Sequence, residues 1–324
     1  MIRRGLIPVL LVIVCALLPL ALTSGFHFNL VIMVFLAVIY TVSLRLVLRS
    51  GLLSFGHSAF IGIGAYASVL LTMECGLPFL VSFLLAGVVS AVIGGLVFYP
   101  ALKVRGAYFV MMTWGVCEVF VAIYKRFQIF GGTQGIWGVP APEIFGFEFV
   151  GKIPYYYMAF ILMLVVILIC YRLEKSRFGL IVRGTATSEE LSVSVGVNIA
   201  WYKVTNFAIA CFFAGLGGSF LAHYIHLVDA ETFGWFFSER IATYMLVGGG
   251  GSIWGAIIGA STLSLLHEFW RGATEYGMLL HGGLLILTML FLPQGLVSIP
   301  AVLKRRGISL KIFSSKKVAG NGAS

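Results

Sequence analysis

Six histidines and twelve acidic residues are the side chains from which a metal site or a catalytic centre would be built. His223 and His226 stand three residues apart with an aspartate after them, but this loose ligand set has no fourth member nearby. Ser54 and His57 also lie close together, yet no acid stands beside them to orient the imidazole for hydrolysis. We therefore predict no metal site, no catalytic residues and no bound cofactor.

A single acid, Glu118, lies within an apolar run that we predict to span a membrane over residues 107–124. A carboxylate at mid-depth in a bilayer costs about 2.5–3.5 kcal/mol unless it is neutral, paired or hydrated. Glu118 is therefore either a proton-coupling or substrate-binding acid, or a bundle-facing acid that a neighbour satisfies near a helix end. The chain has no GxxxxGK(S/T) motif, so it does not bind the phosphates of ATP in that way.

Two glycine-rich segments, residues 51–67 and 248–260, form the most informative pattern in the chain. Small residues at helical intervals let neighbouring helix backbones approach closely, and packing alone explains such a pattern. Paired glycine-interrupted segments in the two halves of a membrane protein also point to a transport path between the halves. On this interpretation, the residues that line or gate the path are Ser54, Gly56, His57, Gly62, Gly64, Gly248, Gly249, Gly250 and Gly251.

The composition indicates which elements must position these residues. Of 324 residues, 60% are hydrophobic and only 10% are charged, and the formal net charge is +10. Soluble domains contain about 45–50% apolar and about 25% charged residues, so this chain lacks the polar residues to cover a water-facing surface and is not a soluble enzyme. Its five scattered cysteines include no CxxC pair and predict neither a disulfide framework nor a zinc site.

Long stretches without charged side chains predict an all-α, polytopic transmembrane bundle of about ten spans in a single domain, residues 1–324. About 20 helical residues cross the hydrocarbon core, and a spanning helix satisfies its own backbone hydrogen bonds. We break the run at 239–267 at its four consecutive glycines, because each costs about 1 kcal/mol relative to alanine inside a helix. The predicted spans are 5–23, 30–48, 51–73, 78–100, 107–124, 154–171, 204–227, 239–250, 252–267 and 277–298.

Positive charges predict the orientation, because lysine and arginine collect in short loops on the cytoplasmic side. With the N-terminus inside and an uncleaved first span, the basic clusters after the second, fourth and sixth spans all fall in the cytoplasm. The basic tail at 304–324 joins them only if the number of crossings is even, which the glycine break provides either as ten crossings or as a re-entrant hairpin. Lys125 and Arg126 are the exception, since this topology places them outside.

Two loops are long enough to have a role of their own. The outer segment 125–153 carries Gly-Gly-Thr-Gln-Gly, and three prolines lie within it or just after its end, so it is predicted to form a surface cap rather than a span. The inner loop 172–203 contains much of the polarity of the chain. Within it, Ser188 is placed to cap a short helix that begins at Glu189, and we predict that this amphipathic helix lies along the inner face of the membrane.

Four segments in a fixed order carry a family resemblance. They are GLLSFGHSAFIGIGAY at 51–66, GAYF at 106–109, GGTQG at 131–135 and the glycine-rich stretch at 248–259. Together they resemble the permease subunits of ABC importers for branched-chain amino acids, and most of all the larger, M-type permease of such systems. The resemblance extends through nearly the whole chain to about residue 300.

This resemblance implies a type II ABC importer fold and a set of partners. These are a second permease subunit, two cytoplasmic ATPase subunits, a periplasmic substrate-binding protein and membrane lipid, with no nucleic acid. It also implies that the inner loop carries a coupling helix on which the ATPases dock. Glu189 and Gly196 match the family pattern, whereas Leu191 and Ser192 stand where alanines are common. The candidate coupling residues are Arg183, Ser188, Glu189, Glu190 and Gly196.

The resulting hypothesis is a permease of a bacterial inner membrane with both termini in the cytoplasm. It would move branched-chain or similar hydrophobic amino acids inward while partner subunits hydrolyse ATP. The alternative is a stand-alone secondary transporter that is coupled to protons through Glu118 and carries a small organic solute. A membrane-embedded enzyme would need histidines and acids clustered on one cavity, which the sequence does not suggest. The sequence leaves open whether the cargo is a branched-chain amino acid, urea, an amide or another small carboxylate.

Overall fold

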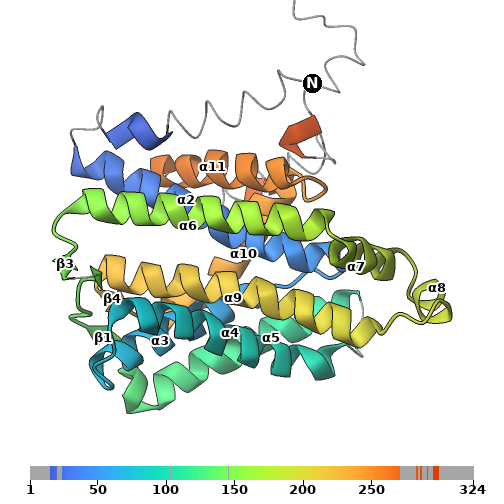
Figure 1. The fold of residues 1–324 in the computed structure, drawn as a ribbon, viewed down its shortest axis with the longest axis horizontal. Helices are drawn as coiled ribbons and strands as arrows, with labels where there is room; N and C mark the ends of the chain where they lie inside the picture. The colour runs from blue at the N-terminus through green and yellow to red at the C-terminus, as the bar shows by residue number, and fades with distance from the viewer. Residues whose placement is uncertain are drawn as a thin grey trace, which may run out of the picture.

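The computed structural model describes residues 15–19, 24–102, 104, 106–144, 146–270, 282–283, 285–286, 290 and 295–298. Across these residues the regular secondary structure is α-helical apart from short 3-10 turns and four two-residue strands (Figure 1). The helices are α2 (Gly25–Arg49), α3 (His57–Met73), α4 (Phe79–Ala101), α5 (Ala107–Arg126), α6 (Lys152–Lys175), α7 (Arg177–Thr187), α8 (Glu189–Ser194), α9 (Ile199–Ile225), α10 (Trp235–Gly248) and α11 (Ile253–Trp270). The 3-10 turns are η1 (Gln128–Phe130), η2 (Glu231–Phe233) and η3 (Leu296–Ser298), and the strands are β1 (Ile136–Trp137), β2 (Glu143–Ile144), β3 (Phe147–Glu148) and β4 (Leu227–Val228).

The predicted spans between residues 30 and 267 correspond to helices α2–α6 and α9–α11. Within the described residues, α2, α4, α5, α6 and α9 are long and apolar enough to cross a membrane. The pair α10 and α11 meets the same criterion but is bent by 120° at its break, and α3 is a shorter apolar helix of 17 residues. The predicted spans 5–23 and 277–298 lie largely outside the described residues, and the basic tail 304–324 lies wholly outside them.

Helix α3 begins six residues later than the span predicted from residue 51. Gly51 has a φ of +81°, a left-handed conformation that ends α2 and that glycine adopts at little cost. The next residues run without helix to Gly56, and the amide of Phe55 donates a hydrogen bond of 3.1 Å to Thr113 Oγ1 on α5. Hydropathy alone does not distinguish this apolar, non-helical connection from the apolar helix that follows it.

Helices α2 and α9 form the centre of the bundle. Most of their residues are buried, whereas α4 and α5 expose one apolar face along much of their length. Helix α9 packs against α3, α4 and α2, while α2 packs against α6, α10 and α11 (Figure 1). Ser90 on α4 joins two of these neighbours, since its Oγ lies 2.8 Å from the Phe60 carbonyl oxygen and 2.9 Å from that of Cys211. The central helices are therefore held in place by polar as well as apolar contacts.

The two ends of the bundle carry different secondary structure. All four strands lie at one end, which we call the strand end, and helices α7 and α8 lie at the other, which we call the α8 end (Figure 1). Helix α9 connects them and has 27 residues, which corresponds to about 40 Å of helix. The elements that could position a site therefore fall into two separate groups.

The segment predicted to cap the outside, residues 125–153, includes the last residues of α5 and the first of α6, and its described part between these helices contains only a short 3-10 turn and short strands as regular structure. Strand β1 pairs antiparallel with β4, and β2 with β3. His226 donates from Nδ1 to the Val139 carbonyl at 2.8 Å, and His223 Nδ1 lies 2.9 Å from the Pro140 carbonyl oxygen. These histidines fasten the cap to α9, and the described residues contain no group of three side chains able to hold a metal ion.

Candidate functional site

The first predicted path segment lies where α2, α3 and α5 meet. Ser54 and His57 are fully buried. Ser54 Oγ accepts a hydrogen bond of 3.3 Å from the Gly56 amide, and His57 Nε2 lies 2.8 Å from Ser43 Oγ on α2. Gly56 approaches α5 so closely that a Cβ atom there would clash with the carbonyl of Thr113. These contacts fix the start of α3 inside the bundle.

Gly62 and Gly64, the remaining predicted path residues of α3, lie at close contacts with neighbouring elements. A Cβ atom at Gly64 would clash with the backbone of Gly215 on α9, and one at Gly62 would lie 2.9 Å from the ring of Phe233. Gly218 on α9 approaches the backbone of α3 in the same way. The geometry thus gives both residues a packing role, and their role in a transport path stays a prediction.

The second predicted path segment forms the turn between α10 and α11. Helix α10 ends at Gly248 and α11 begins at Ile253, so the predicted break at the glycines is confirmed. Gly249 has a φ of +105°, and Gly248 touches the backbone of Gly255 on α11. Gly251 has open space where a Cβ atom would stand, while a Cβ at Gly250 would press on the Leu48 side chain. Glycine is thus required at Gly248 and Gly249 more than at Gly251.

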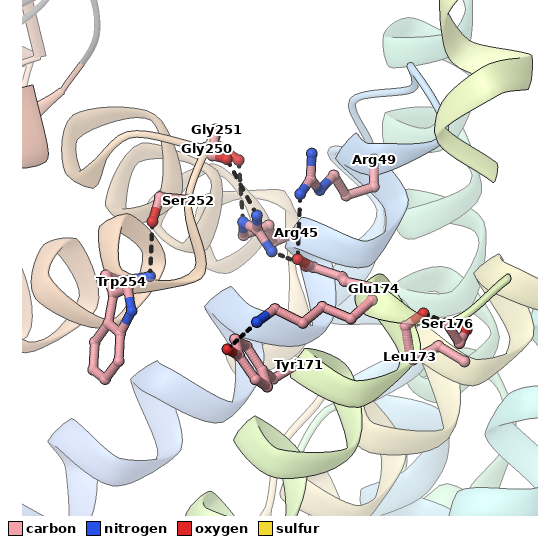
Figure 2. A network of polar contacts seen from close by, with 11 residues as sticks. Arg45, Arg49, Tyr171, Leu173, Glu174, Ser176, Gly250, Gly251, Ser252 and Trp254 are labelled. Carbon is pink, nitrogen blue, oxygen red and sulfur yellow. Dashed lines mark hydrogen bonds and ion pairs between the residues drawn. The ribbon is translucent and has the colours of Figure 1, made fainter. Parts of the chain in front are cut away.

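Arg45 on α2 holds this turn in place (Figure 2). Its side chain is only 1% exposed. Nε donates to the Gly250 carbonyl at 3.1 Å, Nη2 donates to the Gly251 carbonyl at 3.4 Å, and the guanidinium forms an ion pair with Glu174 on α6. A buried charge is tolerated when it is paired and hydrogen-bonded, and here the turn and α6 satisfy it together. We call these four residues the Arg45 network.

The Arg45 network reaches the inner loop. Arg49, one turn further along α2, places Nη2 3.4 Å from Glu174 Oε2 (Figure 2). Two residues after Glu174, Ser176 caps α7 by accepting a hydrogen bond of 3.3 Å from the Gly179 amide. A continuous series of contacts therefore runs from the glycine turn through Arg45 and Glu174 to the first turn of α7.

Helix α8 forms where the sequence predicts a short helix. Ser188 is its N-cap, and its Oγ accepts a hydrogen bond of 3.3 Å from the Leu191 amide. Glu189 pairs with Lys203 on α9 at 2.5 Å, and the Lys203 side chain is only 6% exposed. Gly196, with a φ of +82°, lies in the turn that follows. Glu189 thus fastens α8 to α9.

Three apolar side chains are exposed on α8 and at its C-terminal end. Leu191, Val193 and Val195 are 67%, 60% and 71% exposed. The neighbouring candidates Arg183 and Glu190 are also exposed, and a polar hollow of about 350 Å³ lies between α7, α8 and the segment after α2. The α8 end therefore presents apolar side chains beside a polar hollow, an arrangement that fits the docking of another protein.

A larger cavity of about 410 Å³ opens between α2, α9, α10 and α11 toward the strand end. Its wall combines apolar side chains with polar residues, among them Asn29, Glu231, Arg240, His267 and Glu268. All nine predicted path residues are described by the structure, and none of them lines this cavity. The sequence predictions and the cavity therefore point to different parts of the bundle.

Most of the sequence matches a known protein family. Residues 26–289 match the family described as branched-chain amino acid transport system, permease component. The chain belongs to this family. The resemblance noted from the glycine motifs is thereby confirmed, and the described helices make the chain a multi-pass membrane protein of this permease family.

Individual relatives agree with the family match. The permease is 32% identical over 272 residues to the high-affinity branched-chain amino acid transport system permease protein LivM of Salmonella typhimurium, and 31% identical to LivM of Escherichia coli. Each match covers 76% of this chain but only 64% of the relative. A probable branched-chain amino acid transport permease protein LivH of Methanocaldococcus jannaschii is 23% identical over 265 residues, which is 76% of this chain and 83% of that one. No solved structure matches the permease.

The Arg45 network and the cavity of the permease were not found from the sequence. Glu174 lies 129 residues after Arg45, and the two glycine carbonyls lie 205 and 206 residues after it, so no local motif connects them. The one available indication was an arginine inside the apolar run of α2, because a charge there needs a partner.

Proposed function

We propose that this chain is a permease subunit of an ABC importer in a bacterial inner membrane, which moves branched-chain or similar hydrophobic amino acids inward. The observation that carries the proposal is the family match over residues 26–289. The permease itself performs no bond chemistry in this proposal, and separate ATPase subunits supply the energy. The similarity to the two LivM proteins supports the choice of cargo.

The proposed fold has about ten spans of the type II importer class. The bent pair α10 and α11 supports this count, because a turn at the glycines sends the chain back toward the strand end. An even number of crossings then leaves both termini and the inner loop in the cytoplasm. The strand end faces the periplasm in this arrangement, where a substrate-binding protein would deliver cargo.

A second permease subunit is proposed to cover the outer face of α5. Glu118 lies on this face and is exposed, at the twelfth position of a 20-residue helix. Tyr108 and Met111, which are 76% and 63% exposed, lie on the same helix. A carboxylate that faced lipid at this depth would cost about 2.5–3.5 kcal/mol, so a protein or water-filled surface is the cheaper neighbour.

The two ATPase subunits are proposed to dock at the α8 end, with α8 as the coupling helix. Exposed Leu191 and Val195 provide apolar contact, and Arg183, Glu190 and the polar hollow provide the polar surroundings. The Lys203 ion pair and the Ser188 cap hold α8 as a unit. Movement of α8 would reach the glycine turn through α7 and the Arg45 network, as a small rigid-body shift.

Uptake of labelled L-leucine tests this function. The chain is expressed together with the genes beside it in a strain that lacks its own branched-chain uptake systems. We expect uptake that needs ATP and is lost when the ATPase genes are left out. Uptake by this chain alone, driven by a proton gradient and abolished in Glu118→Gln, would instead establish the secondary-transport alternative.

Two matched variants test the docking surface in the same system. Leu191→Asp places a charge on the exposed side of α8, whereas Val150→Asp does so at the strand end, where the side chain is 81% exposed. We expect Leu191→Asp to reduce uptake and ATPase co-purification at least fivefold, and Val150→Asp to leave ATPase co-purification near normal. Equal ATPase recovery in the two variants would remove α8 from the docking surface.

A further inference from the structure

The cavity toward the strand end has the size and lining to hold a small amphipathic ligand. Its volume is about 410 Å³, and its wall on α2 extends from Asn29 to Tyr40, which corresponds to about 16 Å of helix. Leu30, Met33 and Leu36 supply an apolar strip along this wall. Ligand sites commonly combine such apolar walls with a few well-placed polar groups.

Arg240 is the cation of this cavity, and it lies on α10. Its Nη1 lies 3.3 Å from His267 Nε2, and its guanidinium carbon stands 5.7 Å from the centre of the Phe237 ring. In the part of the chain that the structure describes, no carboxylate comes within ion-pair distance of Arg240. The neighbours of the Arg240 guanidinium are thus an imidazole nitrogen and an aromatic ring face. The planar guanidinium can therefore still bind a carboxylate through two parallel hydrogen bonds.

Two carboxylates also line the cavity. Glu268 stands beside His267 on α11, and Glu231 lies at the rim, where it pairs with Lys125 at 2.8 Å. The cavity therefore presents a positive group, negative groups and an apolar strip within one volume. An α-amino acid with an apolar side chain carries the complementary set: a carboxylate, an ammonium group and a hydrocarbon chain.

We propose that this cavity binds the amino acid during transport, with its α-carboxylate on Arg240 and its side chain along the apolar strip of α2. The inference rests on the proposed function and adds a binding site to it. In this arrangement the glycine segments hold the helices together, and Arg240 selects for the carboxylate. The ammonium group is directed toward the carboxylates that line the cavity.

Protection of a cysteine in the cavity tests the site directly. Ser264 lines the cavity on α11, and Ser264→Cys is introduced together with Cys15→Ser and Cys75→Ser, since the other three cysteines are buried. The full chain is co-expressed with its neighbouring permease, and membrane vesicles free of soluble binding protein are treated with a methanethiosulfonate reagent. We expect millimolar L-leucine to slow labelling at least threefold, and L-leucinol, which lacks the carboxylate, to have no effect.

Variants of Arg240 test its assignment. Arg240→Gln is expected to raise the L-leucine concentration for half-protection at least tenfold, and Arg240→Lys to raise it less. Arg126→Gln, which removes an exposed charge at the end of α5, is expected to change it less than twofold. Because the L-leucinol comparison keeps Arg240 in place, it remains decisive even if an Arg240 variant folds poorly.

Two outcomes would overturn the site. These are the absence of protection by saturating L-leucine and equal protection by L-leucine and L-leucinol. Uptake by the complete transporter is measured in parallel with the labelling. Normal uptake without protection overturns the cavity alone, whereas the absence of uptake overturns the proposed function.

Discussion

The charged side chain of Arg45 is only 1% exposed, and groups from two segments that are distant in the sequence surround it. Glu174 supplies the opposite charge, while the Gly250 and Gly251 carbonyls accept hydrogen bonds. Removing one partner from a buried pair leaves the other charge uncompensated, and this usually costs more than the pair itself contributes. The Arg45 side chain is therefore expected to control the stability of the glycine turn.

Arg45→Met is predicted to destabilise the permease by about 3 kcal/mol. This value is at the lower end of the range of about 3–5 kcal/mol for breaking a buried pair, because Arg49 still reaches Glu174 at 3.4 Å. Adding Glu174→Met should recover part of the loss, since no charge then remains buried. Thermal unfolding of the purified protein in detergent measures both effects.

Arg49→Met is the matched control for this prediction. Its side chain is 29% exposed, and partly exposed ion pairs contribute about 0–1 kcal/mol. We expect a loss below 1 kcal/mol. Equal losses for the two arginine variants would contradict a special role for the Arg45 network.

At the level of elements, the small residues of α3, α4 and α9 set the distance between helices. Gly64 faces the backbone of Gly215, and backbone atoms cannot move aside as a flexible side chain can. Gly115 on α5 has open space where a Cβ atom would stand. Substitution by alanine should therefore destabilise the bundle at Gly64 but not at Gly115.

Gly64→Ala is predicted to destabilise the bundle by about 1–3 kcal/mol, the usual cost of overpacking, and to lower the amount of folded protein. Gly115→Ala should be neutral or stabilising by up to about 1 kcal/mol, because alanine favours a helix over glycine. Protein abundance and size-exclusion profiles in detergent measure the difference. Normal abundance of the Gly64→Ala protein with lost uptake would favour the transport-path interpretation of this glycine.

The elements themselves were largely predictable from the sequence. Charge-free runs located α2–α6 and α9–α11, the four glycines predicted the break after Gly248, and Ser188 predicted the start of α8. The late start of α3 was missed, since apolar residues suit a helix and a non-helical connection equally well, and the separate helix α7 was missed too. The Arg45 network and the cavity depend on contacts between residues up to about 200 positions apart, which local patterns do not encode.

For the whole molecule, the separation of its two ends determines what each can contact. Helix α9 extends about 40 Å between them, and the hydrocarbon core of a bilayer is about 30 Å thick. Thr133 in the cap and Val195 after α8 are both exposed and lie beyond opposite ends of this helix. They should therefore face opposite sides of the membrane.

Single cysteines at these positions test that arrangement. Thr133→Cys and Val195→Cys are placed in turn in a chain whose accessible Cys15 and Cys75 are replaced by serine. In intact spheroplasts an impermeant thiol reagent is expected to label the Thr133→Cys protein from the periplasm. The Val195→Cys protein should react only after the membrane is opened. Labelling of both from one side would contradict the proposed topology, because the 410 Å³ cavity and the α8 surface would then face the same side of the membrane.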